Sequence, residues 1–497
     1  MNVAAKRMQP SERKDMQGLL LTAYGGLPEA SFLLLSIRDR AAAAAWLAAA
    51  PITCGDIRDA SKVLQLALTA AGMRALGVPE AIIAGFSAEF VAGMAEEDGR
   101  SRRLGDLEAN APARWRWGYR SVPHVLAALY AEKGGLAAWR QRIADDRFAA
   151  GFEIIDELPT SDMGPKEPFG FTDGISQPRL DWDHGPRDAA ALAEYGNLIA
   201  AGEFVLGYRN EYGFYTDRPV LDAGLPGAAG LPAAEDAAAK RDLGRNGTYL
   251  VFRELHQDVR AFWRFFSSLP GDGRAVAEAC IGRRIDGTPL VPTTGSIRGI
   301  AAKAVAVNGF TYEGDPSGLA CPIGAHVRRA NPRTGDMPGG RQTWLGRFIR
   351  TLGLGPADLQ QDLVAASRFH RILRRGREFG SYLPREEAVK PEAPDPRAGL
   401  HFICLNANIA RQFEFVQNAW LASAKFAGLS GESDPVIGNR LPDPAGEATD
   451  AFTMPQPNGI ARRVAAIPQF VTVAGGAYFF LPGVSALRFL AACGSAG

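Results

Sequence analysis

The feature that most constrains the fold is a strand-then-helix unit that occurs twice in each half of the chain. In the first half, apolar runs at residues 31–37 (SFLLLSI) and 62–69 (KVLQLALT) are each followed by an alanine-rich, helix-forming segment. A further strand is expected at residues 152–158 (FEIIDEL). Short apolar runs next to segments of helical periodicity are typical of sheets that pack against helices.

The second half of the chain repeats this order of elements. Residues 248–253 (TYLVFR) precede QDVRAFWRFFSS, in which apolar residues recur every three or four positions. Residues 399–406 (GLHFICLN) precede the helical IARQFEFVQNAWL, and residues 477–481 (AYFFL) form a late strand. The repeated order predicts an α+β protein with two similarly built domains, each a sheet covered by helices.

A length of 497 residues favours more than one domain. The segment 218–240 is rich in Gly, Ala and Pro and is the best linker. We therefore expect an N-terminal domain at 1–217, a linker at 218–240 and a C-terminal domain at 241–497.

The composition excludes several classes of function. There are 55 basic and 54 acidic residues, so no net field draws the chain to nucleic acid or to an anionic membrane. The apolar run at 41–51 is too short to span a bilayer. The five cysteines are scattered and lack a CxxC pair, which argues against a disulfide framework and a zinc ribbon. A cytoplasmic protein is the expectation.

The six histidines of the chain are not spaced as a shared metal site. HExxH, GxSxG and Walker A motifs are also absent. A metal held by one histidine needs a cofactor that brings its own remaining ligands. Haem does so, because its iron takes one axial imidazole from the protein.

His326 is the histidine whose surroundings suit that role. It lies in CPIGAHVRRANPR, where Gly324 and Ala325 leave room for a flat ring near the backbone. Three arginines follow His326, among them Arg329 and Arg333. Their positive charge and long side chains suit the propionate groups of haem. The alternative is a polar loop with a solvated basic face.

Two further segments contain candidate polar residues. In PFGFTDGISQP, Asp173 and Gly174 form a turn framed by Phe169 and Phe171, which places a carboxylate beside an apolar surface and leaves its pKa available for proton transfer. In HRILRRGREFG, at residues 370–380, four arginines compete for any functional role. On composition alone, a solvated basic helix end is the simpler interpretation of this second segment.

Together these segments resemble the dye-decolourising peroxidase family. GFTDG at 170–174 is similar to its GxxDG motif, CPIGAHVRRANPR to its proximal-histidine segment and ILRRGREFG to the stretch with its distal arginine. Further resemblance extends over nearly the whole chain, in GEFVLGYRNEYG, NGTYLVFRELHQDV, GLHFICLNANIARQFEFVQNAW and GGAYFFLPGVSALRFL. The chain is most similar to the longer subgroup of that family, without a secretion signal.

The resemblance implies two ferredoxin-like domains, with antiparallel sheets covered by helices in a dimeric α/β-barrel-like arrangement. It implies one haem b per chain, held in the second domain beneath the GxxDG loop of the first. His326 would ligate the iron on the proximal side, with Asp173 on the distal side. The other residues expected at the cofactor are Arg329, Arg333, Gly174, Leu400 and Phe402.

The family alignment selects Arg374 as the distal arginine, with Arg375 as its nearest competitor. The implied reaction reduces hydrogen peroxide to water and oxidises dyes or phenolics in one-electron steps. Asp173 would transfer the proton and Arg374 would stabilise the developing charge. Because aspartate has a reference pKa of about 3.9, we expect an acidic optimum.

Other details stay open at the sequence level. Asp434 and Glu414 both qualify as the carboxylate behind the proximal histidine. Trp420 could relay electrons to bulky donors, although an aromatic residue on an amphipathic helix is more often core. The expected partners are hydrogen peroxide and small aromatic donors, not nucleic acid or membrane, and homo-oligomerisation is left open.

Two other functions compete with the peroxidase. One is a haem-binding protein that handles haem or its iron without peroxidase turnover. The other is a duplicated α+β binding module with no cofactor.

Overall fold

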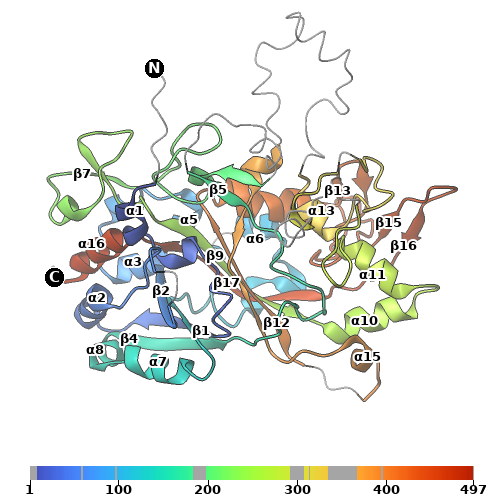
Figure 1. Cartoon of the computed structure of the whole chain (residues 1–497), viewed down its shortest axis with the longest axis horizontal. Coiled ribbons are helices and arrows are strands. Elements are labelled where there is room, and N and C mark those ends of the chain that lie inside the picture. Colours follow the sequence, from blue (N-terminus) through green and yellow to red (C-terminus); the bar gives the residue numbers. More distant parts are fainter. Residues whose placement is uncertain are drawn as a thin grey trace, which may run out of the picture.

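The computed structural model describes residues 8–57, 60–95, 98–182, 197–291, 307–312, 314–333, 366–392 and 396–495. One nine-stranded antiparallel sheet runs through the centre of these residues (Figure 1). Its strand order is β10-β12-β9-β17-β2-β3-β1-β4, and β11 also pairs with β12. The strands are β1 (Glu29–Ile37), β2 (Lys62–Leu68), β3 (Val125–Ala131), β4 (Phe152–Pro159), β9 (Thr248–Gln257), β10 (Leu373–Arg374), β11 (Arg377–Phe379), β12 (Ala398–Asn406) and β17 (Val471–Leu481).

The N-terminal half of the sheet has the order β2-β3-β1-β4, with the first and third strands in the middle. Successive residues of β1 enter different cores: Leu33 and Leu35 pack on one face, and Phe32 and Leu34 on the other. Burial on both faces explains why this strand is a continuous apolar run. The helices of this half are α2 (Arg40–Ala49), α3 (Ala70–Ala75), α7 (Leu136–Ile143) and α8 (Asp146–Gly151).

The C-terminal half of the sheet follows the same plan, with the order β10-β12-β9-β17. Its helices include α10 (Val259–Ser268) and α11 (Gly273–Ile281), which Figure 1 shows on the opposite side of the molecule from α2 and α8. The segments η7 (Ala410–Glu414) and η8 (Val416–Ala422) are π-helical. The helix α16 (Val484–Ser495) follows β17 and packs against α2 of the other half.

The two halves join where β17 pairs with β2, through Phe480 and Leu68. The predicted α+β class and antiparallel ferredoxin-like sheets are confirmed. In the described ranges the barrel-like arrangement takes the form of one continuous open sheet, since the strand path runs from β10 to β4 without closing.

The segment 218–240 is folded onto the rest of the protein. It carries β7 (Val220–Asp222), which pairs with β8 (Lys240–Asp242), and Leu221, Ala228 and Leu231 enter the same core as α2. The division into domains at 217 and 241 stays a prediction.

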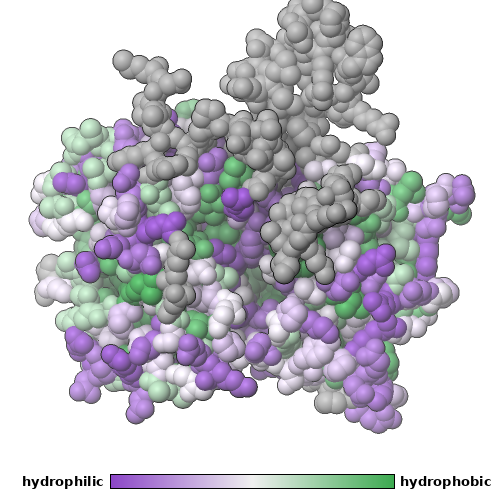
Figure 2. Space-filling view, in the orientation of Figure 1, coloured by the Kyte–Doolittle hydropathy of each residue, from purple (hydrophilic) through white to green (hydrophobic). Residues whose placement is uncertain are grey.

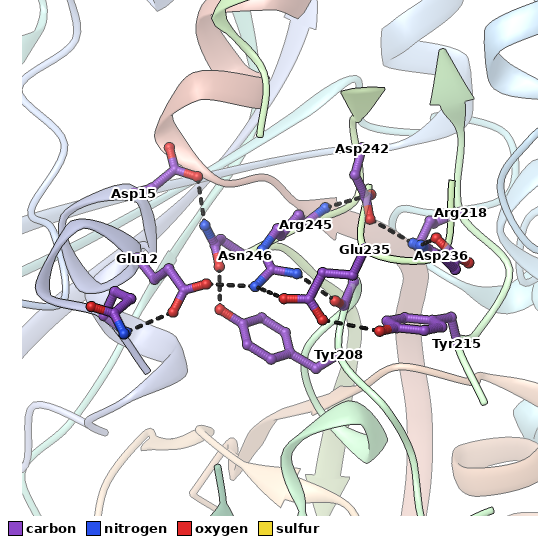
Figure 3. A network of polar contacts seen from close by, with 12 residues as sticks. Glu12, Asp15, Tyr208, Tyr215, Arg218, Glu235, Asp236, Asp242, Arg245 and Asn246 are labelled. Carbon is purple, nitrogen blue, oxygen red and sulfur yellow. Dashed lines mark hydrogen bonds and ion pairs between the residues drawn. The ribbon is translucent and has the colours of Figure 1, made fainter. Parts of the chain in front are cut away.

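A polar network ties the start of the described chain to its last helix (Figure 3). Arg245 donates to Glu12 in α1 (Pro10–Asp15), pairs with Glu235 and lies over the ring of Tyr208. Asp15 accepts the backbone N–H of Ser485 at 2.7 Å, so α1 caps the first turn of α16. The buried Arg245 is thus paired with two carboxylates, and Asp15 links α1 to α16.

The surface mixes hydrophilic and hydrophobic residues. On the face drawn in Figure 2, hydrophilic residues alternate with smaller hydrophobic areas. Every helix in the described ranges falls short of the length and hydrophobicity that crossing a bilayer requires.

Candidate functional site

A cavity of about 290 Å³ brings the three predicted segments together. His326, Asp173 and Arg374 all line it. Leu400 and Phe402 also line it, from alternate positions of β12 that lie on the same face of the strand. Residues far apart in the sequence therefore converge on one space.

His326 is the first residue of α13 (His326–Ala330). Its Nδ1 atom lies 3.0 Å from Oδ2 of Asp434, which is fully buried. Asp434 Oδ1 accepts the backbone N–H groups of Val436 and Ile437. Because Nδ1 is held by Asp434, the ring can offer Nε2 to the cavity.

The protonation of His326 reflects these surroundings. Enclosure in the protein lowers its pKa, but the charge and hydrogen bond of Asp434 raise it, and the net pKa lies above its ordinary value. Asp434 has a pKa below its usual range, because the opposing effects of His326 and Arg329 outweigh burial. The pair thus keeps a negative charge behind the imidazole.

Glu414, the other carboxylate considered for this role, lies elsewhere. It is buried against Arg100 and Arg103 and accepts the hydroxyl of Tyr478 at 2.9 Å. The structure brings Asp434, and not Glu414, to the proximal histidine.

Asp173 and Arg374 line the same cavity and form an ion pair with each other. Nη1 of Arg374 lies 2.9 and 3.1 Å from the two carboxylate oxygens of Asp173. Enclosure raises the pKa of Asp173, whereas the Arg374 charge and the backbone N–H of Gly174 lower it, and the net pKa is below its usual value. A third of the Asp173 side chain, 33%, stays exposed, so a small molecule can reach it.

The loop around Asp173 is held by neighbouring elements. The N–H of Thr172 donates to Ile285, and the N–H of Asp173 donates to Pro165, both at 2.9 Å. Phe169 stacks on Phe262 of α10 at 4.2 Å between ring centroids. The aromatic residues that frame the aspartate therefore fasten this loop to α10. Gly174 adopts a φ of +75°, a conformation that favours glycine at this turn.

The side chains of Arg374 and Arg375 point in different directions, and this identifies the distal arginine candidate. Arg375 is buried and donates to the carbonyls of Leu19 and Leu20 at the start of the chain. Neighbouring positions on a strand point to opposite faces, so only one of the two can face the cavity. That residue is Arg374.

Of the two arginines expected to bind the propionates, one lines the cavity and the other points away from it. Arg333 lines the cavity, with its guanidinium 3.9 Å above the ring of Phe310 and bonded to the Asn308 and Phe310 carbonyls. Arg329 is fully buried and donates to four carbonyls, of Gly324, Trp420, Ser423 and Glu432. Arg329 therefore links α13 to the segments around Trp420 and Glu432 and does not line the cavity.

Sequence reasoning missed Arg371. This buried arginine lines the cavity, and burial together with the nearby cations Arg333, Arg368 and Arg374 lowers its pKa to about 9. In the sequence it was one of several clustered arginines, and composition offered no signal to separate it from the others.

Trp420, considered as an electron relay, is half-buried in η8. Its ring meets the edge of His370 at 5.1 Å, and His370 stacks on Phe415 and lines the cavity. Its relay role stays a prediction.

The cavity matches the chemistry of haem. Its lining combines the carboxylate-held imidazole of His326, the Asp173–Arg374 pair and apolar side chains that include Val327, Leu421 and Val436. Buried arginines on the same cavity suit propionate groups. The residues present therefore fit a flat apolar macrocycle that carries a metal and two carboxylates.

Comparison with known proteins agrees with this geometry. No family model matches the chain. The "Multifunctional dye peroxidase DyP2" of an Amycolatopsis species is 29% identical over 450 residues, covering 86% of this chain and 82% of that protein. "Dye-decolorizing peroxidase msp1" of Mycetinis scorodonius is 26% identical, covering 86% and 75% respectively.

Solved structures share the fold over nearly the whole chain. A DyP-type peroxidase of Anabaena superposes with a TM-score of 0.67 and 21% identity, covering 97% of this chain and 95% of that one. A fungal DyP-type peroxidase from Auricularia auricula-judae gives 0.70 and 22%, covering 96% and 99%.

The curated relatives define the class of the protein as a peroxidase. The chain is similar over most of its length to proteins named dye-decolourising peroxidases, and the solved structures that share its fold are DyP-type peroxidases, a family for which haem is the implied cofactor.

Proposed function

We propose that the protein binds one haem b per chain, reduces hydrogen peroxide to water and oxidises dyes and phenolic donors in one-electron steps. The observation that carries this proposal is the convergence of two polar pairs on one cavity. His326 with Asp434 forms one pair, and Asp173 with Arg374 forms the other.

The proximal residues hold the cofactor in this proposal. Asp434 fixes the orientation of the His326 ring and keeps it electron-rich, as a hydrogen-bonded carboxylate does for metal-binding imidazoles. Arg333 and Arg371 line the cavity and would hold the propionates. Leu400 and Phe402 line the same cavity and would offer the macrocycle an apolar contact.

The distal residues handle the proton and the charge. Haem supplies the iron that binds peroxide and the redox equivalents of the reaction. Asp173 accepts a proton from one peroxide oxygen and delivers it to the other, which leaves as water. Arg374 stabilises the negative charge that develops as the O–O bond breaks, a contribution of roughly 3 kcal/mol for a preorganised donor.

The test compares absorption spectra of wild type and His326→Ala after haem supplementation, before and after peroxide. We expect a Soret band in wild type that peroxide changes, and loss of that band or of its normal ligation in His326→Ala. Asp173→Asn and Arg374→Leu should retain haem and lose most peroxide-dependent dye oxidation.

The other outcomes identify different functions. Haem retention without any peroxide-dependent turnover in wild type would indicate a protein that handles haem or its iron. No Soret band after supplementation would leave only the cofactor-free binding module.

A further inference from the structure

Glu167 lies six residues before Asp173 and also lines the cavity, yet it has no part in the reaction described above. Its carboxylate accepts three hydrogen bonds. Oε1 accepts the backbone N–H of Phe171 at 2.9 Å, and Oε2 accepts that of Phe169 at 3.0 Å. Oε2 also accepts Nε2 of Gln257, on β9, at 2.7 Å.

The backbone of the same residue closes the turn. The N–H of Glu167 donates to the carbonyl of Phe171 at 2.9 Å, and the N–H of Gly170 donates to the carbonyl of Glu167 at 2.8 Å. Gly170 has a φ of +96°, a left-handed conformation that favours glycine. The turn 167–171 therefore encloses the carboxylate that organises it, and Asp173 follows two residues later.

We propose that Glu167 is a positioning residue for Asp173. By binding the N–H groups of the loop and tying them to the sheet through Gln257, it fixes Asp173 against Arg374. The role in catalysis rests on the proposed peroxidase function, whereas the hold on the loop does not.

Gln257 can keep a hydrogen bond to Glu167, and so keep the loop attached to the sheet, whether Glu167 is ionised or protonated. Enclosure raises the pKa of Glu167 to about 7, against the opposing effects of Gln257 and the two loop N–H groups. The Oε1 atom of Gln257 is buried and has no hydrogen-bond partner among the described residues. When Glu167 is protonated, a turn of the Gln257 amide lets Oε1 accept the new O–H. The loop thus stays in place in acid, where the proposed reaction is expected to be fastest.

The substitution that tests this role is Glu167→Gln, which keeps the shape of the side chain. An amide nitrogen accepts no hydrogen bond, so the substitution leaves the N–H of Phe169 or Phe171 without its acceptor. The matched control is Glu378→Gln. The charge of Glu378 also reaches Asp173, but its carboxylate bonds its own backbone N–H.

The first measurement is amide hydrogen exchange in a peptide covering residues 168–173, in protein with and without haem. We expect exchange to be about tenfold faster in Glu167→Gln, the change that corresponds to loss of one hydrogen bond, and unchanged in Glu378→Gln. Unchanged exchange in Glu167→Gln overturns the proposal.

The second measurement is the rate constant for the reaction of the haem-loaded protein with peroxide. Glu167→Gln should lower it about tenfold, with haem content and the Soret position kept. In an Asp173→Asn background the same substitution should add less than about twofold, because residues that act through one another are not additive. Multiplied losses in the double variant overturn the positioning role.

The two measurements separate the two proposals. If wild type binds haem but does not react with peroxide, the proposed function fails, and hydrogen exchange alone decides whether Glu167 holds the loop. If Glu167→Gln does not fold, Gln257→Leu removes a single donor and should raise exchange in the same peptide about threefold.

Discussion

At the scale of single residues, each candidate polar group in the cavity is controlled by one partner. Asp434 holds a negative charge behind His326, and Arg374 holds Asp173 in its ionised form. The two pairs serve the same cavity but have different proposed roles. His326 with Asp434 would supply electron density to a metal, and Asp173 with Arg374 would remove a proton from the substrate. Disturbing either partner should therefore change a different measurable property.

The pH dependence follows from the Asp173–Arg374 pair. A base must be ionised to act, and the pKa of Asp173 lies below its ordinary value, so activity should persist as pH falls until that lowered pKa is passed. We expect dye oxidation by the haem-loaded protein to peak on the acid side of neutrality. A peak above neutral pH would contradict the role of Asp173.

Replacing Arg374 should shift this profile. In Arg374→Leu the carboxylate loses the positive charge that lowers its pKa, so the acid limb of whatever activity remains should move to higher pH. A pH profile of the residual rate of peroxide reduction checks this. An unshifted limb would mean that Asp173 is not the group that titrates.

The proximal pair predicts a change in the cofactor itself. Asp434→Asn removes the negative charge behind His326 and should weaken haem affinity roughly tenfold and make the reduction potential more positive. Glu414→Gln, in a carboxylate that pairs with Arg100 instead, should leave the potential unchanged. Spectroelectrochemistry of both variants distinguishes them, and equal potentials would remove Asp434 from the site.

The sequence predicted the principal polar residues of the cavity but not all their neighbours. His326 and Asp173 stood out because each lies in a distinctive short segment. Arg329 looked as suitable as Arg333, since a sequence shows charge and spacing but not the direction of a side chain. Arg329 donates to four carbonyls, some of them in η8 and the segment after it. The sequence around Arg329 does not indicate these distant contacts.

At the scale of elements, α10 supports the distal loop. Asp258 caps its first turn by accepting the N–H of Ala261 at 2.7 Å. Phe262 stacks on Phe169, and the indole N–H of Trp263 donates to the Phe169 carbonyl at 3.0 Å. The helix therefore contributes both apolar packing and a hydrogen bond to the segment that carries Asp173.

Trp263→Phe removes the indole hydrogen bond together with part of a buried ring. It leaves the buried Phe169 carbonyl without the indole donor and should lower the free energy of unfolding by about 1–3 kcal/mol. Urea denaturation measures the change. Ser268→Ala, at an exposed position in the last turn of the same helix, should stay within about 0.5 kcal/mol. Equal values for the two variants would mean that the indole bond does not stabilise the loop.

The strands β1, β2, β4, β9 and β12 and the end of β17 were predictable because their apolar runs are clear, as were the helices that follow β1, β2 and β9. The central strand β3 (Val125–Ala131) and helices such as α7, α8, α11 and α16 were not predicted. The helix after β12 was expected from IARQFEFVQNAWL, but its π-helical hydrogen bonding over Ala410–Glu414 and Val416–Ala422 was not. A π-turn adds one residue per turn where tertiary contacts require it, so it leaves no periodic signal in a single sequence.

At the scale of the whole molecule, the cavity is lined both by strands of the C-terminal half of the sheet and by the loop of Asp173, which follows the N-terminal strands. Leu400 and Phe402 on β12 form part of its wall, and Arg253 and Leu255 on β9 continue it. A ligand in this cavity contacts segments from both halves of the chain, so binding should stabilise the entire fold.

Haem binding should therefore raise the unfolding temperature in a concentration-dependent way. A ligand that binds only the folded state adds about 2.7 kcal/mol at a hundredfold excess over its Kd. Differential scanning calorimetry of wild type and His326→Ala at several haem concentrations measures this. Most of the shift should be lost in His326→Ala, and equal shifts would show that haem binds elsewhere.

The pairing of β17 with β2 also bears on how the protein is made. The ribosome synthesises Lys62–Leu68 long before Val471–Leu481, with an interval of roughly 20 to 80 seconds at ordinary elongation rates. Until the later strand emerges, β2 and β9 each keep an edge of unpaired backbone groups, which other nascent chains can recruit. Rapid overexpression, or a stop codon before residue 471, will therefore direct the polypeptide toward inclusion bodies, and slower translation or a chaperone that shields strand edges will raise the soluble yield.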